Sequence, residues 1–369
     1  MTKIVGFVKK NAVAVIAFFA AMITVFIVPP DKEYLGYFDF KTLTCLFCVL
    51  AVVCALRNIN FFYILARKTV TLFNNTRMCI LALVYITFIG SMIIANDMAL
   101  LTFLPLGYFV LESTNMKKHM AFTFIMQNIA ANLGGMLTPF GNPQNLYLYT
   151  KFNIPNGEFM RIMLLPFLIA ILIITVLCFT VKKEPLSLPD EKVSFDKKRA
   201  IIYSVLFVLS ILIVFRGIHY LIGLVVIPVC LLFLDRKALK AVDYPLLLTF
   251  VFFFIFSGNM ARMDAVRELF QFLLSKSTLI FSILSCQIIS NVPSAILLSQ
   301  FTDNYPALLV GVNIGGVGTL IASLASLITY REYSKHNPGG SRYYLKKFML
   351  YNLVFLVVLT FVMSFIVPR

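Results

Sequence analysis

The sequence of 369 residues is poor in charge and poorest in acidic residues, with 16 Asp and Glu against 32 Lys and Arg. Charged residues make up only 13% of the chain, whereas a soluble domain carries about 25%. Hydrophobic residues make up 60%, and the mean hydropathy is +0.91. These values exclude an ordinary soluble domain. Long apolar runs without the alternation of a β-barrel predict an all-α, polytopic membrane protein.

Several motifs that mark enzymes and pumps are also absent. The chain has no Walker A, HExxH or GxSxG motif, which argues against ATP-driven transport by this chain alone and against the hydrolases that use the other two. Its three histidines lack metal-ligand spacing, and its seven cysteines lie in apolar segments as small hydrophobic residues. We therefore expect no catalytic residue, no metal and no cofactor other than a coupling Na⁺ or H⁺.

The net charge of +16 reflects membrane orientation rather than a nucleic-acid partner. The basic residues fall in short loops between apolar runs, as the positive-inside rule requires. With a cytoplasmic N-terminus and each broken apolar segment folded back as a hairpin, 23 of the 32 Lys and Arg residues lie inside and 9 outside. This threading predicts a multi-pass protein of the inner or plasma membrane with its C-terminus outside. Tryptophan is absent, so the 16 tyrosines must supply the aromatic belt.

Two glycine-rich interruptions of apolar sequence share one pattern. The first reads Asn132-Leu-Gly-Gly-Met-Leu-Thr138-Pro-Phe-Gly141-Asn142-Pro-Gln-Asn145, and the second reads Asn313-Ile-Gly-Gly-Val-Gly-Thr319-Leu-Ile-Ala322-Ser323. Asn, Gly-Gly and Thr recur in the same register, 181 positions apart. A lipid-facing helix does not tolerate such a break, because unpaired backbone groups are costly in hydrocarbon. Paired breaks in two halves of a chain point to the binding site of a transporter.

The apolar segments divide the chain into two halves with the same order of elements. Each half has a span, an amphipathic segment, a broken apolar segment, a glycine-broken span and a final span. The broken segments have polar centres at Asn96-Asp97 and Ser290-Asn291, and we interpret them as re-entrant hairpins; one long kinked helix is the alternative. We predict two inverted-topology repeats with about 9 transmembrane helices, 2 re-entrant hairpins and discontinuous helices.

The predicted boundaries follow from these segments. They are residues 1–181 for the first repeat (hairpin 78–111, broken helix 118–150), 182–218 for a cytoplasmic linker and connecting helix, and 219–369 for the second repeat (hairpin 278–301, broken helix 305–330).

Hairpin tips and breaks should meet near the bilayer midplane. Half-helix N-termini there suit anions, while unwound carbonyls suit cations. Any one Ser or Thr in a membrane helix more often joins helices than binds a ligand, but the paired arrangement favours a binding site. The predicted substrate-binding residues are Asn96, Thr138, Gly141, Asn142, Asn145, Asn291, Thr319 and Ser323. The predicted coupling-ion residues are Asp97, Asn132, Ser290 and Asn313.

Asp97 is the only acidic residue that the sequence places deep in an apolar segment. An ionised carboxylate at that depth is costly and points to function. We interpret Asp97 as the carrier of a coupling proton, or as a ligand that coordinates a cation together with nearby carbonyls. The structural alternatives are an ion pair with Lys or Arg, or a helix cap on the second hairpin arm.

The motif between Asn132 and Asn145, with the earlier Asn96-Asp97, resembles the ion transporter superfamily, and more narrowly the arsenical pump membrane protein and citrate-transporter-like permeases. The resemblance implies two inverted repeats, a scaffold domain, a mobile domain that carries the hairpins, and elevator-type alternating access. It also implies an anionic or oxyanion substrate and often a homodimer. The divalent anion/sodium symporters of this superfamily carry Ser-Asn-Thr at both tips, which this chain lacks, so two symmetric sodium sites do not carry over.

The sequence therefore predicts a secondary active transporter, not an enzyme. Its substrate would be a small anion or oxyanion, such as a carboxylate, sulfate or arsenite, moved with a proton or sodium. A sodium/proton antiporter without an anion substrate is the alternative among transporters. A non-transporting membrane scaffold or sensor is the alternative of another class, although it leaves the paired breaks unexplained.

Overall fold

The computed structural model describes residues 11–185 and 196–367, and this part of the chain is helical without a named strand. The long helices are α2 (Ala12–Ile27), α3 (Phe40–Asn58), α5 (Thr76–Ile94), α6 (Asn96–Ser113), α7 (Met120–Gly134), α9 (Asn156–Phe179), α10 (Lys197–Val214), α11 (Tyr220–Leu234), α13 (Tyr244–Ala261), α14 (Asp264–Ile289), α17 (Leu324–His336) and α18 (Ser341–Ser364). The short ones are α4 (Phe61–Val70), α8 (Pro143–Lys151), α12 (Arg236–Lys240), α15 (Asn291–Leu298) and α16 (Tyr305–Ile314), with 3₁₀ turns η1 (Lys32–Tyr37), η2 (Lys117–His119), η3 (Gly135–Leu137) and η4 (Pro338–Gly340).

The composition of these helices confirms the all-helical membrane fold that the sequence predicts. Within the described ranges, six helices are long and apolar enough to cross a membrane: α3, α5, α9, α13, α14 and the unit of η4 and α18. Shorter apolar helices are α2, α11 and α16. The predicted total of about nine spans stays a prediction, because several apolar helices are short or interrupted.

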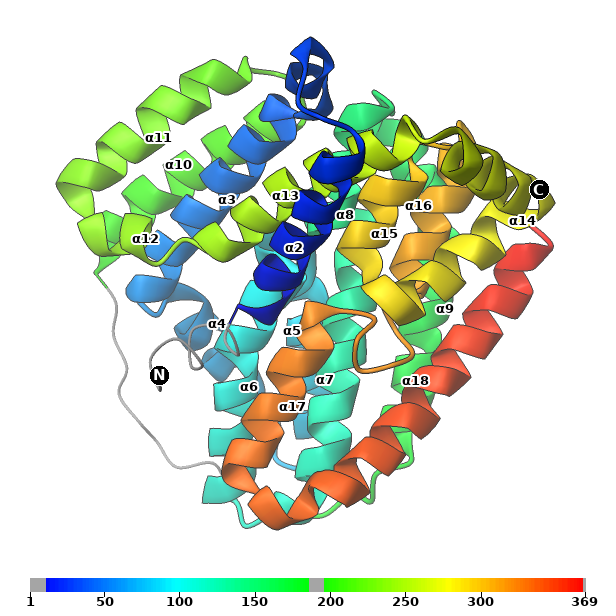
Figure 1. Ribbon diagram of the computed structural model, residues 1–369. Coiled ribbons are helices and arrows are strands. Elements are labelled where there is room, and N and C mark those ends of the chain that lie inside the picture. Colours follow the sequence, from blue (N-terminus) through cyan, green and yellow to red (C-terminus); the bar gives the residue numbers. More distant parts are fainter. Residues whose placement is uncertain (1–10, 186–195, 368–369) are drawn as a thin grey trace.

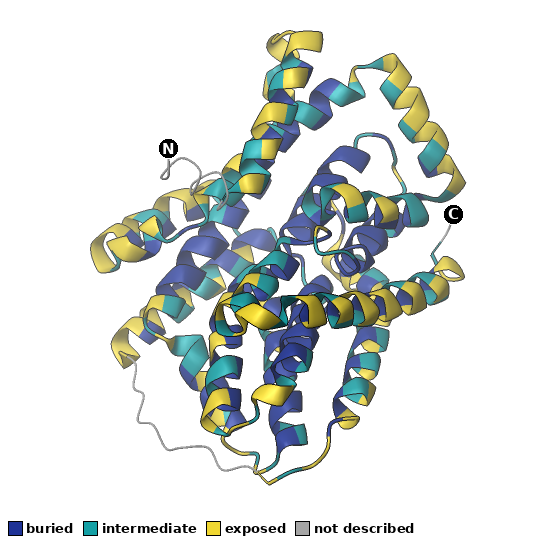
Figure 2. Cartoon of the chain, turned by 60° about the horizontal axis from the view of Figure 1, so that its bottom comes forward, coloured by how far each residue is buried: buried dark blue, intermediate teal, exposed yellow. Residues whose placement is uncertain are grey.

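The helices form two bundles (Figure 1). In the peripheral bundle, α2 packs along α13, and α3 packs along α10 and α11. In the central bundle, α5, α6 and α7 pack on one another, and α14 packs on α15 and α16. The helices α8, α9, α17 and α18 complete the central bundle. Figure 2 shows the dark blue, buried helices at the centre and yellow, exposed faces on the outer helices.

The two broken apolar segments fold back on themselves, as the hairpin interpretation requires. The turns lie at Ala95 and Ser290, which have φ of 67° and 76°, an uncommon conformation for residues other than glycine. Across the first turn, a Cβ at Gly90 would lie 2.4 Å from the Phe103 ring, so the arms pack closely there. Across the second, the hydroxyls of Ser285 and Ser294 are 2.8 Å apart. The kinked-helix alternative is thereby wrong for both segments.

The predicted breaks are present. The first break separates α7 from α8, and the second separates α16 from α17. The second hairpin is predicted to begin at residue 278, and the backbone is non-helical directly before it: Ser277 has φ of −167° and ψ of 102°, so α14 consists of two helical parts joined by a kink. Residues 186–195 of the predicted linker lie outside the described part of the chain.

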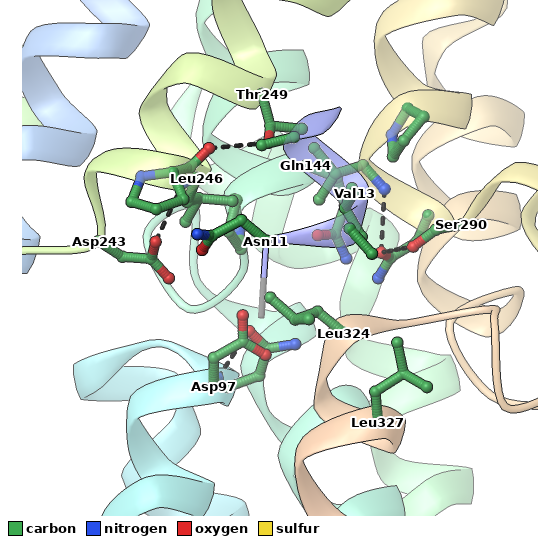
Figure 3. A pocket seen from close by; sticks show the side chains of 18 of the residues that line it. Asn11, Val13, Asp97, Gln144, Asp243, Leu246, Thr249, Ser290, Leu324 and Leu327 are labelled. Carbon is green, nitrogen blue, oxygen red and sulfur yellow. Dashed lines mark hydrogen bonds between the residues drawn. The ribbon is translucent and has the colours of Figure 1, made fainter. Parts of the chain in front are cut away.

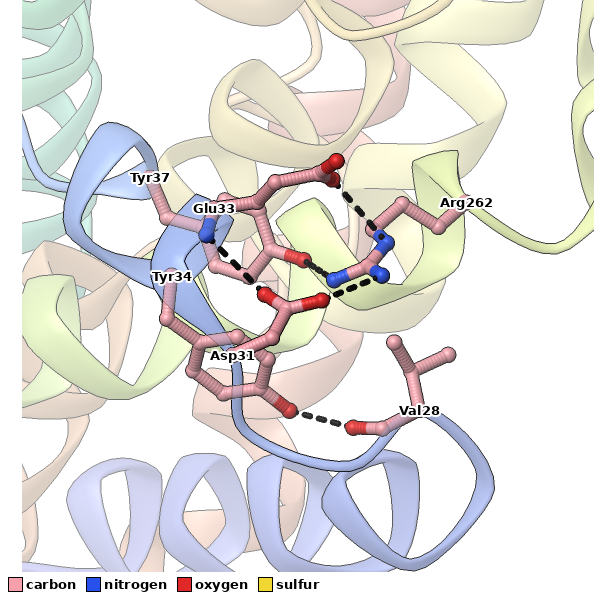
Figure 4. Close-up of polar contacts among 6 residues, drawn as sticks. All are labelled: Val28, Asp31, Glu33, Tyr34, Tyr37 and Arg262. Atoms are coloured by element: carbon pink, nitrogen blue, oxygen red, sulfur yellow. Dashed lines mark hydrogen bonds and ion pairs between the residues drawn. The ribbon is translucent and has the colours of Figure 1, made fainter.

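Arg262 holds the loop between α2 and α3 against the junction of α13 and α14 (Figure 4). Its Nη2 lies 2.6 Å from Asp31 Oδ2, its Nε lies 3.3 Å from Glu33 Oε2, and its Nη1 donates to the Tyr37 hydroxyl at 3.1 Å. The hydrogen bond from Arg262 lowers the pKa of the Asp31 carboxyl. The Tyr37 ring packs over Gly258, where a Cβ would lie 2.5 Å from the ring. These contacts fix the position of η1.

Candidate functional site

Each hairpin tip is bonded to a glycine-rich break through the backbone. The N–H of Asn96 donates to the carbonyl of Gly141 at 3.1 Å, and the N–H of Asn291 donates to that of Ala322 at 3.0 Å. The first N–H groups of a helix have no partner within it, so each bond satisfies a donor at the start of α6 or α15. The acceptors directly precede the N-caps of α8 and α17. Each tip is therefore fixed next to the start of a second helix.

Two threonines, one in each break, make a matching pair of side-chain hydrogen bonds to the hairpins. Thr138 Oγ1 donates to the carbonyl of Met92 at 2.7 Å, and Thr319 Oγ1 donates to that of Gln287 at 3.2 Å. Thr138 and Thr319 are 181 positions apart, as are Gly141 and Ala322, while Met92 and Gln287 are separated by 195, as are Asn96 and Asn291. The two halves thus use the same hydrogen bonds at equivalent positions. Both threonines bind the end of a hairpin arm and are absent from the cavity lining.

A cluster of buried amides joins the two breaks at the centre of the molecule. Asn313 Nδ2 donates to Asn145 Oδ1 at 2.6 Å, and Asn142 Nδ2 donates to Asn313 Oδ1 at 3.2 Å. Asn96 Nδ2 donates to Asn132 Oδ1 at a longer 3.4 Å. All five side chains are at most 4% exposed. Amides buried without partners would destabilise the fold, so these mutual bonds fix the breaks relative to the first tip.

A cavity of about 120 Å³ lies where the tips and breaks meet (Figure 3). It is surrounded by the starts of six helices: α6, α8, α15 and α17 of the central bundle, and α2 and α13 of the peripheral bundle. Its polar or charged lining residues are Asn11, Asn96, Asp97, Gln144, Asp243, Thr249, Ser290, Asn291 and Arg331. The N-terminus of a helix carries partial positive charge and free N–H groups, so this arrangement favours a negatively charged ligand.

Two carboxylates also reach this cavity. Asp97 is the second residue of α6, and Asp243 caps α13 by accepting the N–H of Leu246 at 3.0 Å. Asp97 Oδ1 is buried and has no donor within the described ranges. The same holds for Oε1 of Gln144, a residue that is 1% exposed. The cavity therefore combines helix N-termini with oxygen acceptors that remain unpaired.

The predicted site residues divide into two layers. The cavity is lined by four of them: Asn96, Asp97, Ser290 and Asn291. The layer behind it holds the other eight: Asn132, Thr138, Gly141, Asn142, Asn145, Asn313, Thr319 and Ser323. Ser323 caps α17 and exchanges a 2.9 Å hydrogen bond with Ser326. Gly141 lies so close to Gly135 that a Cβ would be 2.3 Å from the Gly135 carbonyl oxygen. The second layer fixes the conformation of the breaks, and the breaks hold the hairpin tips that carry the first layer.

Sequence reasoning did not single out Gln144, Asp243 or Arg331. Gln144 lies inside the first glycine-rich motif, so its position there was the available signal. Asp243 precedes Tyr-Pro and is recognisable as a helix cap, but only the packing of α13 beside the first tip brings it to the cavity. Arg331 lies seven residues after the start of α17, directly after the predicted broken helix 305–330.

Comparisons with known proteins identify the family of the chain. Residues 2–310 match the family model described as citrate transporter. The chain belongs to the citrate transporter family. It is 34% identical over 331 residues to the uncharacterized transporter MJ0456 of Methanocaldococcus jannaschii, covering 89% of this chain and 90% of that protein. It is 27% identical over 317 residues to the inner membrane protein YbiR of Escherichia coli, covering 83% of each.

Membership of the citrate transporter family confirms the resemblance found in the sequence. This family member is a multi-pass membrane transporter that acts on a small substrate, and family membership favours a transporter over an enzyme. The family match includes the first tip, the first break and the second tip, and it ends at residue 310, before the second break.

Proposed function

We propose that this protein is a secondary active transporter of a small anion or oxyanion, coupled to a proton or sodium gradient. One observation carries the proposal: α6, α8, α15 and α17 all begin at the same cavity, beside the neutral amides of Asn96 and Asn291. The starts of four helices supply partial positive charge through free N–H groups, which suits an anion that must be released again. A carboxylate such as citrate, sulfate, or arsenite in its neutral acid form fits these donors.

Two inverted repeats are part of this proposal. The matched hydrogen bonds of the tips and threonines support them, because equivalent residues in each half make equivalent contacts. The repeats as predicted would cover residues 1–181 and 219–369, with the linker and connecting helix between them. With a cytoplasmic N-terminus, the first hairpin opens to the cytoplasm and the second to the outside.

Alternating access would take place by sliding of the central bundle along the peripheral one. In support, the cavity lies at the boundary between the bundles and next to the starts of α2 and α13, not next to their ends. A second, smaller pocket lies beside this cavity, where the bundles meet. Its lining is largely apolar and includes Leu46 and Val49 of α3 and, from the central bundle, Phe140 and Leu146. With the N-terminus in the cytoplasm, a cavity next to the starts of α2 and α13 would lie on the cytoplasmic side.

A panel of ligands tests the proposal directly. The purified protein is melted with small carboxylates and oxyanions, each with and without sodium and at two pH values. A ligand that binds the folded state raises the melting temperature with its concentration. We expect one class of anion to stabilise the wild type and Asn352→Ala, a buried residue of α18 outside the cavity lining, but not Asn291→Ala. Stabilisation by sodium or pH with every anion silent would favour the sodium/proton antiporter instead.

A further inference from the structure

The two carboxylates at the cavity belong to different bundles. Asp97 is carried by α6 of the central bundle, while Asp243 belongs to the loop that starts α13 of the peripheral bundle. Figure 3 shows them on facing sides of the cavity, with Asp97 below and Asp243 at the left. Both line the same cavity, where two negative charges repel each other. Repulsion of this kind is relieved when a positive charge lies between the two groups.

The unpaired atoms around these carboxylates are all acceptors. Asp97 Oδ1 and Gln144 Oε1 are both buried and lack a donor in the described structure. Asp243 uses Oδ1 to cap α13, and its Oδ2 accepts no hydrogen bond from the described residues. Carboxylate and amide oxygens are the ligands of hard cations and acceptors for a bound proton. A helix N-terminus alone would leave donors unpaired, so these acceptors indicate a ligand of positive charge.

The charges that line the cavity do not balance. Asp97 and Asp243 contribute two negative charges, and Arg331 contributes one positive charge from α17. Arg331 lies seven residues beyond the start of α17, about 10 Å along the helix axis from it. Arg57 approaches the first hairpin from α3, with its Nη1 3.4 Å from Met98 Sδ, but it is not part of the described lining. Counted over the described residues alone, the lining carries a net charge of −1, which opposes an anion.

We propose that Asp97 and Asp243 jointly hold one monovalent cation, a proton or a sodium ion, and that the anion binds with useful affinity only once this cation is present. Gln144 supplies a neutral oxygen to the same site. The inference rests on the proposed function and deepens it, because it makes coupling a matter of charge balance in one cavity. Asp243 belongs to the peripheral bundle and Asp97 to the central one. The cation site is therefore complete only in the arrangement of the two bundles that this structure has.

Asparagine variants test this without removing the helix cap. Asn and Asp cap helices about equally well, so Asp243→Asn removes the charge and keeps an acceptor for the Leu246 N–H. The matched control is Asp235→Asn, which alters the cap of the neighbouring helix α12 outside the cavity lining. Asp97→Asn is the second test variant. All are melted as full-length protein in sodium chloride against choline chloride at pH 8, and between pH 5.5 and pH 8 without sodium.

For a sodium site, Asp243→Asn and Asp97→Asn should each raise the half-maximal sodium concentration at least about tenfold, while Asp235→Asn titrates like the wild type. For a proton site, the two cavity variants should lose the pH-dependent change of melting temperature that the wild type and Asp235→Asn keep. A cation response that is lost in Asp97→Asn and unchanged in Asp243→Asn would overturn the shared site and leave the proposed transporter intact. Absence of anion uptake by the wild type would overturn the proposed function itself.

Discussion

Replacing Asn313 by alanine should destabilise the whole site from a position behind it. Asn313 Nδ2 donates to Asn145 Oδ1, and its Oδ1 accepts from Asn142 Nδ2 at 3.2 Å and Gln144 Nε2 at 3.4 Å. Asn142 Nδ2 keeps a second acceptor in the carbonyl of Asn132. Asn145 Oδ1 and Gln144 Nε2 have no other partner among the described residues, so the substitution leaves two buried polar atoms unpaired.

The expected loss follows from the cost of those two atoms. Each buried polar group left without a partner costs about 1–3 kcal/mol, which gives about 2–6 kcal/mol of unfolding free energy for Asn313→Ala. A loss of that size should lower the melting temperature by at least about 4 °C. Thermal melting of the purified protein, followed by fluorescence or by retention in size exclusion, measures this.

Asn352→Ala is the matched control for this prediction. Asn352 is 0% exposed like Asn145, but its Nδ2 donates only to the carbonyl of Phe348 within its own helix. Its removal leaves no partner on another helix unpaired, so the protein should lose about 1 kcal/mol. If Asn313→Ala melts no lower than Asn352→Ala, the amide cluster does not join the two breaks in the way argued here.

Two further predictions concern the first break and the loop before α3. Gly141→Ala would place its Cβ 2.3 Å from the Gly135 carbonyl oxygen and should cost about 1–3 kcal/mol and most transport, while Gly157→Ala, with open space around it, should leave both unchanged; equal activity of the two variants would refute the close approach. Arg262→Gln should lower thermal stability at neutral pH, and the difference from wild type should shrink as pH falls through the lowered pKa of Asp31, because the stability from a depressed carboxyl pKa is lost as that carboxyl is protonated. A difference that does not shrink on acidification would show that this carboxylate is not the group involved.

Much of the fold could be predicted from the sequence because short polar or glycine-rich interruptions mark where apolar helices end or turn. The polar centres Asn96-Asp97 and Ser290-Asn291 predicted the hairpin turns, and helices begin at Asn96 and Asn291 as a change of direction there requires. The glycine-rich motifs predicted both interruptions, since Gly and Pro act on the backbone of their own segment. The helix α14 is kinked at Ser277, directly before residue 278, where the sequence predicts that the second hairpin begins.

The site was harder to predict, because residue type does not decide which layer a side chain occupies. Thr138 and Thr319 have the chemistry of ligands, yet both are bonded to hairpin carbonyls. Asp243 looks like any helix cap, and it reaches the cavity only because α13 of one bundle begins beside the first tip of the other. Contacts between bundles depend on how they pack together, which no local pattern encodes.

Uptake by reconstituted proteoliposomes tests the central claim most directly. The vesicles would carry an imposed proton or sodium gradient and would be offered labelled citrate, sulfate and arsenite in turn. The account predicts saturable uptake of a small anion that one of the two gradients accelerates, retained in Asn352→Ala and lost in Asn291→Ala. Sodium/proton exchange without movement of any anion would contradict the account.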